Sequence, residues 1–523
     1  MRGSTIVDNR GGGLRYEGFG RLEIESSTIS DNGVDAASVG TGPYFGGGLV
    51  LSGPGPIVIR DSTIAGNASG SGGGGIRYAG YGPLQLVHCE IVNNVAGAPG
   101  SRNVDGGGIH FDGDQQLARP RLELRGGTRI VANKSTGNGG GLYLRGGSAR
   151  IGSGAPGALF LGNAAVGHGG AIHATASAQL KVFATVAGTA PAFVGNRANA
   201  NNAVNNFFGG GAVQVENEAP VSKQAVMPTR ALLFDVLLQD NSAAFGGALS
   251  MLSLDAPSEL CVARAIDPNA CNAFGATRPE GAVTCADATS CNRIRDNHAS
   301  YQGDAIARAG KGAAMIVVGA RIDGHSGSSL VFSSYTNFDQ DGAMLELRDC
   351  LIADNVSFGP LFAGFTQPTV PNLEFWLGRV LINRCTIAGN VVGAAHVFQS
   401  RSGLQLRESI VHQPGTTVHA GNAGGVLAQD VIAHETASLP VRLDVITADP
   451  LFVDPANGDF HLGNGSPGLD FADFGDDGVD LDGAPRGFDL PTVIDRFGPR
   501  DLGAYERGPA TLFRDGFEGL DPI

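Results

Sequence analysis

One short pattern constrains the fold of this chain more than any other: an apolar residue followed three positions later by Asn. It occurs eleven times between residues 6 and 390. The copies are Ile6/Asn9, Ile29/Asn32, Ile64/Asn67, Ile91/Asn94, Ile130/Asn133, Phe160/Asn163, Phe193/Asn196, Leu238/Asn241, Ile294/Asn297, Ile352/Asn355 and Ile387/Asn390. Three degenerate copies fill the gaps: Ile322/His325, Ile410/Gln413 and Ile432/Glu435. Together they predict a repeat protein of roughly fourteen turns.

Two further segments recur between the Asn positions. A Gly cluster runs into a strand-like segment at residues 73–78, 106–111, 139–144 and 169–173, and a third short segment alternates apolar and polar residues, as at 121–125. Alternation of period two is typical of a strand with one buried face. The pattern therefore predicts that each repeat contains three short strands and no helix.

The glycine content excludes other fold classes. Gly accounts for 82 of 523 residues, too many for a mainly helical chain, and the glycines cluster instead of occupying every third position as in collagen. Hydrophobic residues make up 42% of the chain, which argues against disorder.

The spacing between successive corner positions indicates how the repeats stack. Asn9 and Asn32 are 23 residues apart, which matches one coil of a parallel β-helix, whereas Asn241 and Asn297 are 56 residues apart, which indicates an insertion. Coils of this kind stack about 4.8 Å apart. We expect the Ile column to face inward, the Asn column to occupy one corner, and the Gly clusters to form another.

The repeats resemble those of the right-handed parallel β-helix repeat proteins of bacterial surfaces. Residues 62–67, Ser-Thr-Ile-Ala-Gly-Asn, followed by Gly-Gly-Gly-Ile, illustrate the likeness, which covers about residues 1–435. The resemblance implies an all-β, pectate-lyase-like solenoid with a C-terminal cap.

The sequence after the repeats carries a different set of motifs. Asp-Pro-Leu-Phe-Val-Asp-Pro at 449–455, Asp-Leu-Asp-Gly-Ala-Pro-Arg at 480–486 and Asp-Leu-Gly-Ala-Tyr-Glu at 501–506 resemble the choice-of-anchor Q domain. That likeness spans residues 436–507 and implies a module that closes a β-helix near a surface-attachment signal. Residues 508–523 contain Phe-Arg-Asp-Gly-Phe-Glu, which resembles a tail of exported proteobacterial proteins.

Charge and hydropathy restrict the partners and the location. The net charge of −14 opposes nonspecific binding to nucleic acid, and no apolar stretch is long enough to form a transmembrane helix. The resemblances imply a secreted or cell-surface protein, although residues 1–6 carry no signal peptide. We therefore expect an upstream segment that carries both a signal peptide and an N-terminal cap.

The seven cysteines form two groups. Cys261, Cys271, Cys285 and Cys291 lie in a polar insertion at about residues 257–292. We expect two disulfides there, and the sequence leaves their connectivity open. A metal site is the alternative interpretation, but the spacing lacks the close Cys pairs of structural zinc sites. Cys89, Cys350 and Cys385 replace the serines of other repeats and are expected to be small buried residues.

The residue that follows each Gly-Gly-x-apolar unit should point outward from the coil. The candidate glycan-binding residues in this column are Arg77, His110, Tyr143, His173 and Gln214, flanked by Arg15, Val50 and Ser250. Their side chains can stack on or hydrogen-bond to sugars. An ordinary solvated sheet face is the alternative interpretation.

Catalysis in the pectate lyases and polygalacturonases that this fold resembles requires clustered carboxylates. The outward column contains none, but Asp240 and Asp296 precede corner asparagines on neighbouring coils and could lie about 5 Å apart, as in a retaining glycosidase. A turn position equally explains an Asp before Asn.

Acidic residues are densest between residues 473 and 489. Asp480, Asp482 and Asp489 resemble the alternating ligands of a calcium loop, although Gly478 and Asp489 depart from the EF-hand pattern. A solvated turn is the alternative, and no other cofactor is expected.

These observations favour an exported, surface-associated β-helix protein that binds a glycan or another surface component without catalysis. The competing hypothesis is a polysaccharide lyase or glycoside hydrolase. The sequence leaves the oligomeric state open.

Overall fold

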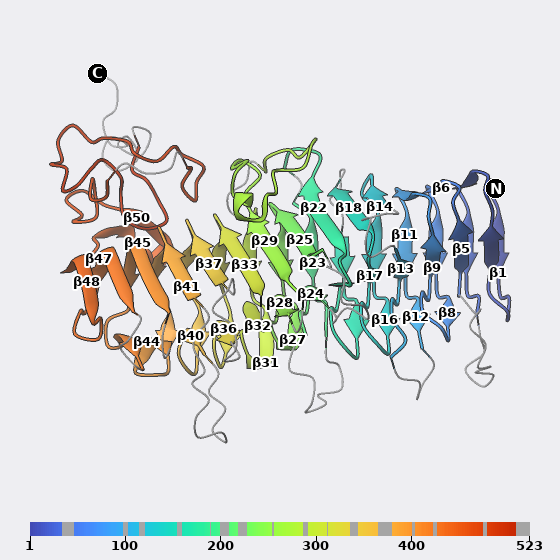
Figure 1. Ribbon diagram of the computed structural model, residues 1–523, viewed down its shortest axis with the longest axis horizontal. Helices are drawn as coiled ribbons and strands as arrows, with labels where there is room; N and C mark the ends of the chain where they lie inside the picture. Colours follow the sequence, from blue (N-terminus) through green and yellow to red (C-terminus); the bar gives the residue numbers. More distant parts are fainter. Residues whose placement is uncertain are drawn as a thin grey trace.

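The chain forms a right-handed parallel β-helix, shown as a rod in Figure 1. The computed structural model describes residues 1–33, 47–97, 103–113, 121–153, 159–188, 190–198, 209–217, 227–253, 256–285, 291–310, 312–334, 344–364, 379–399, 403–421, 426–473 and 478–508. Within these residues there is no α-helix, only two short 3-10 turns, η1 (Asn272–Phe274) and η2 (Pro455–Asn457).

Most of the strands belong to a 26-stranded sheet that contains two rows of strands, one before and one after a backbone bend. The row that carries the Ile column comprises β1 (Thr5–Val7), β4 (Thr28–Ser30), β7 (Thr63–Ala65), β11 (Glu90–Val92), β15 (Arg129–Val131), β19 (Leu159–Leu161), β23 (Ala192–Val194), β26 (Leu237–Gln239), β30 (Arg293–Arg295), β34 (Arg321–Asp323), β38 (Leu351–Ile352) and β42 (Thr386–Ala388).

The second row corresponds to the alternating segments of the sequence. It comprises β3 (Leu22–Glu25), β6 (Ile57–Arg60), β10 (Leu84–Val87), β14 (Arg121–Arg125), β18 (Ser148–Ser153), β22 (Gln179–Ala184), β25 (Thr229–Phe234), β29 (Ser258–Ala263), β33 (Ala313–Val318), β37 (Met344–Arg348) and β41 (Arg379–Asn383). The two rows merge in the long strands β45 (Leu404–His412), β47 (Leu427–Ala433) and β48 (Val441–Thr447).

The strands that follow the Gly clusters form a separate 13-stranded sheet, hereafter the glycine-side sheet. It comprises β2 (Leu14–Glu17), β5 (Leu49–Gly53), β9 (Ile76–Gly80), β13 (Ile109–Asp112), β17 (Leu142–Arg145), β21 (Ile172–Thr175), β24 (Val213–Asn217), β28 (Leu249–Ser253), β32 (Ile306–Gly310), β36 (Val331–Ser334), β40 (Phe362–Ala363), β44 (His396–Gln399) and β46 (Thr417–Ala420).

Short strands complete the structure at the Asn corner and in the C-terminal module. The corner strands are β8 (Ala68–Ser69), β12 (Val95–Ala96), β16 (Lys134–Ser135), β20 (Ala164–Ala165), β27 (Ser242–Phe245), β31 (His298–Gln302), β35 (Ser326–Gly327), β39 (Val356–Ser357) and β43 (Val391–Val392); β49 (Phe452–Asp454) and β50 (Asp459–Leu462) form a hairpin.

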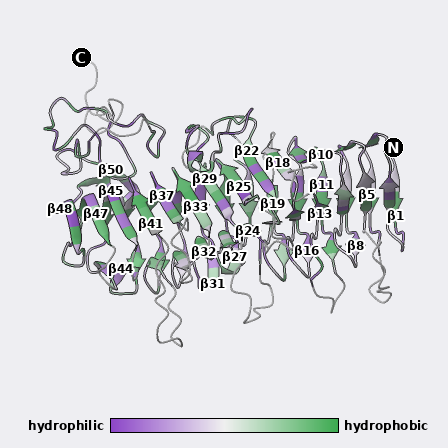
Figure 2. Cartoon of the chain, viewed as in Figure 1, coloured by the Kyte–Doolittle hydropathy of each residue, from purple (hydrophilic) through white to green (hydrophobic). Residues whose placement is uncertain are grey.

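The predicted apolar column forms the core of the rod. Successive members pair in register, and every one from Ile29 to Ile387 is at most 1% exposed. Aromatic rings stack inside the same core, with Phe160 and Phe193 5.0 Å apart between centroids. Figure 2 shows the alternation of apolar and polar residues along the strands. The prediction of three strands per repeat around an apolar interior is confirmed.

A continuous side-chain ladder connects the coils at the Asn corner. From Asn9 to Asn297, each amide donates through Nδ2 to Oδ1 of the next Asn at 2.8 to 3.0 Å. The same oxygen accepts the backbone N–H of the preceding Asn, as Asn133 Oδ1 does from Asn94 at 3.0 Å. The ladder thus satisfies backbone groups that the corner would otherwise bury without partners.

His325 maintains this ladder where Asn is missing. Its Nε2 accepts from Asn297 at 3.3 Å, and its Nδ1 donates to Asn355 Oδ1 at 2.9 Å. Both contacts require the neutral ring with its proton on Nδ1. Burial lowers the pKa of His325 to about 4, which favours this neutral form.

The last two degenerate repeats are shifted by one residue from the sequence prediction. Val411, not Ile410, pairs with Ile387 inside the coil, although Gln413 does accept from Asn390 at 3.1 Å. In the next coil His434 continues the ladder by accepting from the Gln413 N–H at 3.2 Å. Glu435 instead accepts from Val418 N at 2.6 Å, so the assignment of Glu435 to this column is wrong.

The three unpaired cysteines form part of a second ladder of small residues. Ser62 Oγ accepts from Ser27 N at 3.1 Å, and Cys385 Sγ accepts from Cys350 N at 3.4 Å in the same way. Cys89, Cys350 and Cys385 are all buried. Their prediction as small buried residues is confirmed.

The cysteine-rich insertion packs on the outside of the 26-stranded sheet. Two disulfides join Cys261 to Cys271 and Cys285 to Cys291, as expected, and each has a Cα–Cα distance of 5.9 Å. Ser258–Ala263 is strand β29, paired with β25, so the insertion begins after this strand and not at about 257. Cys271 and Phe274 pack with Phe183 and Phe234 in an apolar cluster on the outer face of the sheet.

The C-terminal module, residues 449–473 and 478–508, lies against the side of the last coils and not across their end (Figure 1). Ile410 and Ile432 point outward and pack against Leu469 and Phe471 of this module. Strand β48 pairs with β47, so the coils extend beyond the boundary expected at residue 435, and within the described residues β48 has no second neighbour.

Buried charges fasten the module to the coils. Arg486 contacts Asp349 at 2.8 Å, and Arg384 contacts the same carboxylate, also at 2.8 Å. Burial alone would raise the pKa of Asp349, but Arg486 and Arg384 lower it below its usual value. Because each ionised group has its partners, this network can remain charged in the interior.

In the described part of the chain, no helix has the length and hydropathy needed to span a bilayer. The tail resemblance at residues 512–518 lies outside the described residues.

We predict that Asn133→Leu lowers the free energy of unfolding by at least about 3 kcal/mol, since each buried polar group that loses its partner costs about 1 to 3 kcal/mol. The substitution removes the contacts of Asn133 with Ile91 O, Asn163 and Asn94. Urea unfolding measures the loss. Lys134→Leu, at the adjacent exposed position, is the control, and an equal loss in both variants would contradict a specific role for the ladder.

A second prediction concerns acid stability. The folded pKa of His325 lies below its unfolded value near 6.5, so the unfolded chain binds the extra proton. The stabilising contribution is complete above pH 6.5 and falls by on the order of 3 kcal/mol as the pH decreases towards 4. We expect His325→Asn, which restores the amide ladder, to show a smaller fall in melting temperature between pH 7 and pH 4 than the wild type. An unchanged fall would rule out His325 as the source.

Candidate functional site

The predicted outward column exists as one row of the glycine-side sheet. Its residues pair in register in the order Arg15, Val50, Arg77, His110, Tyr143, His173, Gln214 and Ser250. Their neighbours in each strand point into the core. The direction inferred from strand alternation is therefore confirmed, and the candidate binding residues do lie side by side.

Their exposure to solvent differs along the rod. Arg15 is exposed and Arg77 and His110 are half-buried, whereas Tyr143 is 5%, His173 2% and Gln214 0% exposed. The expectation of an open face is thus wrong for the last three. Strand alternation fixes the face on which a side chain lies but not whether other parts of the chain cover that face.

Ring contacts join the partly exposed residues of this column to the buried ones. Tyr143 lies 5.0 Å from His110 and 5.4 Å from His173 between ring centroids, and His168 packs against His173 at 5.9 Å. Burial lowers the pKa of His110 to about 4, with the charge of Arg77 acting in the same direction. Burial likewise lowers the pKa of His168 to about 4. The two imidazoles are therefore neutral near pH 7 and suited to hydrogen bonding and stacking.

A second feature of the same coils was missed by the sequence interpretation. Phe19 is 90% and Tyr81 78% exposed, and Pro54 is exposed on the coil between them. The signal in the sequence is a repeated tripeptide with glycine on both sides of the central residue. The copies are Gly18-Phe19-Gly20, Gly53-Pro54-Gly55 and Gly80-Tyr81-Gly82.

Close backbone packing explains the glycines of this corner. A Cβ atom at Gly55 would lie 1.9 Å from Gly20 O, and one at Gly82 would lie 2.3 Å from Gly55 O. Gly55 and Gly82 therefore have no room for a side chain, and the neighbouring Pro54 and Tyr81 carry the exposed side chains of their coils. Two steps of about 4.8 Å place the backbones of Phe19 and Tyr81 roughly 10 Å apart along the rod. Phe19, Pro54 and Tyr81 are hereafter called the aromatic corner.

The proposed carboxylate pair occupies backbone turns. Asp240 and Asp296 both have φ of 53°, in the left-handed region, and Gly195 and Gly324 hold the same position on the adjoining coils. Asp240 Oδ2 accepts from Gln239 at 3.1 Å, and Asp296 Oδ2 accepts from Arg295 at 2.8 Å. The backbone conformation therefore explains the Asp at both positions, because Asp tolerates positive φ better than most residues.

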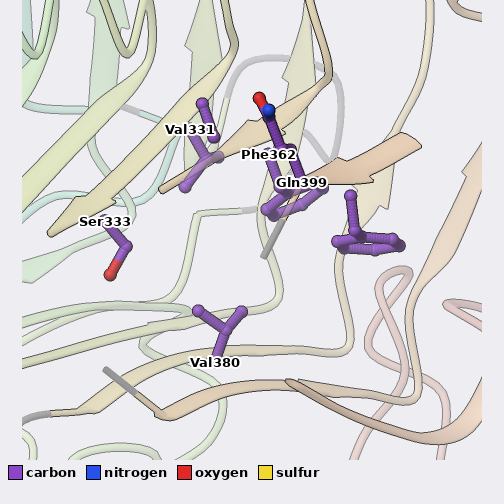
Figure 3. Close-up of a pocket in the computed structure, with 7 residues that line it drawn as sticks. Val331, Ser333, Phe362, Val380 and Gln399 are labelled. Atoms are coloured by element: carbon purple, nitrogen blue, oxygen red, sulfur yellow. The ribbon is translucent and has the colours of Figure 1, made fainter. Parts of the chain in front are cut away.

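The cavity drawn in Figure 3 is lined by residues of β36, β40, β41 and β44, and not by the candidate binding residues. Val331, Ser333, Phe362, Val380 and Gln399 contribute to its lining, and its volume is about 10 Å³. This space holds about one water molecule and excludes a sugar.

The three residues of the predicted calcium loop have separate environments. Both carboxylate oxygens of Asp480 accept backbone N–H groups, from Ala484 at 2.7 Å and Glu506 at 2.9 Å. Asp482 contacts His461 at 2.9 Å. Asp489 lies with Asp470 and Asp495. The acidic motif residue Asp480 thus has a structural role in the loops of the module.

A scan against known protein families found no match, and no curated protein matched the chain. The functional assignment therefore depends on the residues and geometry described above.

We predict that Asp240→Gly keeps the free energy of unfolding within about 0.5 kcal/mol of the wild-type value, whereas Asp240→Ala loses about 1 kcal/mol because Ala is disfavoured at positive φ. Urea unfolding of the two variants measures the difference. Greater stability of the Ala variant would show that the backbone conformation does not explain this Asp.

Proposed function

We propose that this protein is an exported, surface-associated β-helix that binds an extended glycan without transforming it. The first coils of the rod provide the binding face. The observation that carries the proposal is the aromatic corner, which lies on the coils that also bear Arg15 and Arg77.

The chemistry of this face suits a carbohydrate. Exposed rings can pack against the C–H face of a pyranose, while guanidinium and imidazole groups hydrogen-bond to its hydroxyl or carboxylate groups. The separation of Phe19 and Tyr81 by two coils allows stacking on non-adjacent sugars of one extended chain. Tyr143 and His173 are buried, so their role is to support His110: Tyr143 packs beside it on the next coil, and His173 packs against Tyr143. Gln214 is fully buried and lies outside the proposed contact face.

Two observations support export. Disulfides persist mainly in oxidising compartments, and this chain contains two. The resemblance of residues 436–507 to the choice-of-anchor Q domain and of residues 508–523 to an export-associated tail agrees with a location at the cell surface.

The alternative function is that of a polysaccharide lyase or glycoside hydrolase. Its residues would be Asp240 and Asp296, for which the turn conformation already provides an explanation. Reducing-sugar release from pectin and alginate tests this alternative directly. Release by the wild type that disappears in Asp240→Asn/Asp296→Asn would contradict the non-catalytic proposal.

We predict that Phe19→Ala and Tyr81→Ala each weaken glycan binding about 2- to 10-fold, the loss expected for one aromatic contact. A glycan array identifies the ligand, and titration calorimetry with that glycan measures the dissociation constant. The double variant should lose more affinity than either single variant.

The matched control is Phe358→Ala, because Phe358 is 71% exposed on a distant coil. Its affinity should equal that of the wild type. Equal losses in Phe358→Ala and Phe19→Ala, unchanged binding in the double variant, or no binding of any glycan would each overturn the proposed site.

A further inference from the structure

Three carboxylates of the C-terminal module converge at one point. Asp470, Asp489 and Asp495 each place an oxygen within 4.8 Å of the other two. Asp470 is 0% exposed, whereas Asp489 and Asp495 are exposed at the surface. The group therefore has one buried carboxylate, that of Asp470, and two carboxylates that face solvent.

The buried carboxylate lacks part of its hydrogen bonding. Oδ2 of Asp470 accepts from Leu490 N at 3.3 Å, but Oδ1 is buried without a hydrogen-bond partner. Buried polar atoms of native proteins are normally paired, and a charged one is especially costly to leave unpaired. The orphaned oxygen thus indicates a missing positive partner.

Nearby arginines do not supply that partner. Arg496 lies over the ring of Phe471 at 4.7 Å, and Arg500 contacts Glu408 at 3.2 Å. Within the described ranges, no Lys, Arg or His forms an ion pair with Asp470, Asp489 or Asp495. The three carboxylates therefore repel one another at short range.

We propose that Asp470, Asp489 and Asp495 bind a calcium ion. Calcium takes six to eight oxygen ligands in variable geometry, so three carboxylates from irregular loops, completed by water on the open side, suit it better than the strict octahedron of magnesium. This site differs from the Asp480-Asp482 loop expected from the sequence, because the oxygens of Asp480 already accept backbone hydrogen bonds.

The ion would join the surface loop to the interior of the module. Asp489 and Asp495 flank the exposed segment that contains Ile494, while Asp470 is held by the Asp501 carboxylate, which accepts its N–H at 2.9 Å. Calcium thus neutralises the repulsion at Asp470 and fixes both ends of the loop. We expect a dissociation constant of about 10⁻⁴ to 10⁻³ M, the range of extracellular calcium modules.

Calcium titration of the full-length chain by calorimetry tests the site, together with the melting temperature in calcium, in magnesium and in EGTA. The wild type should bind calcium and melt at a higher temperature in its presence. Asp489→Asn and Asp495→Asn should each weaken calcium binding at least 10-fold. Because both residues are exposed, these substitutions should preserve the fold, which circular dichroism checks.

Asp482→Asn is the matched control, since it alters an exposed carboxylate of the other loop. It should retain the calcium response. Loss of binding in Asp482→Asn with retention in Asp495→Asn would overturn the proposal in favour of the sequence-predicted loop. No calcium binding by the wild type at millimolar concentration, or equal stabilisation by magnesium, would also overturn it.

Discussion

The hydrogen-bonded corner is the constraint on which the rest of the structure depends. A β-helix turns its backbone at every corner, and each turn buries peptide groups that no strand can pair. The Asn ladder satisfies these groups from one coil to the next, as Asn133 does for Asn94 and Ile91. The stacking distance and register of both sheets then follow, because each corner fixes where the next coil must lie.

The ladder also determines which residues are tolerated beside it. The position before the corner adopts positive φ, which explains why Asp, Asn and Gly recur there. A run of carboxylates along one edge therefore arises from backbone conformation alone. For Asp240 and Asp296, the same physics that builds the fold produces a pattern that could be mistaken for a catalytic pair.

Strand alternation and the repeats made the fold predictable from the sequence. Alternation also predicted that the residues of the column from Arg15 to Ser250 point outward. It could not predict the exposure of that column, because period two assigns a side chain to a face of the sheet but does not show which side chains pack on that face, as His168 and Tyr143 pack beside His173. It also could not place the C-terminal module. The repeat pattern predicts that Ile410 faces the core, but its neighbour Val411 faces inward and Ile410 packs against the module. When both faces of a strand are buried, period two no longer distinguishes them.

The calcium residues illustrate a related limit. Asp480 and Asp482 are close in sequence and match a ligand pattern, yet the fold uses the Asp480 carboxylate to hold the backbone of two loops. Asp470, Asp489 and Asp495 are brought together only by tertiary packing. In a solenoid, contacts are confined mainly to neighbouring coils, so features at opposite ends of the rod are energetically separate. The aromatic corner lies near the N-terminus and the acidic group lies in the module at the far end (Figure 1), so glycan binding and calcium binding should vary independently.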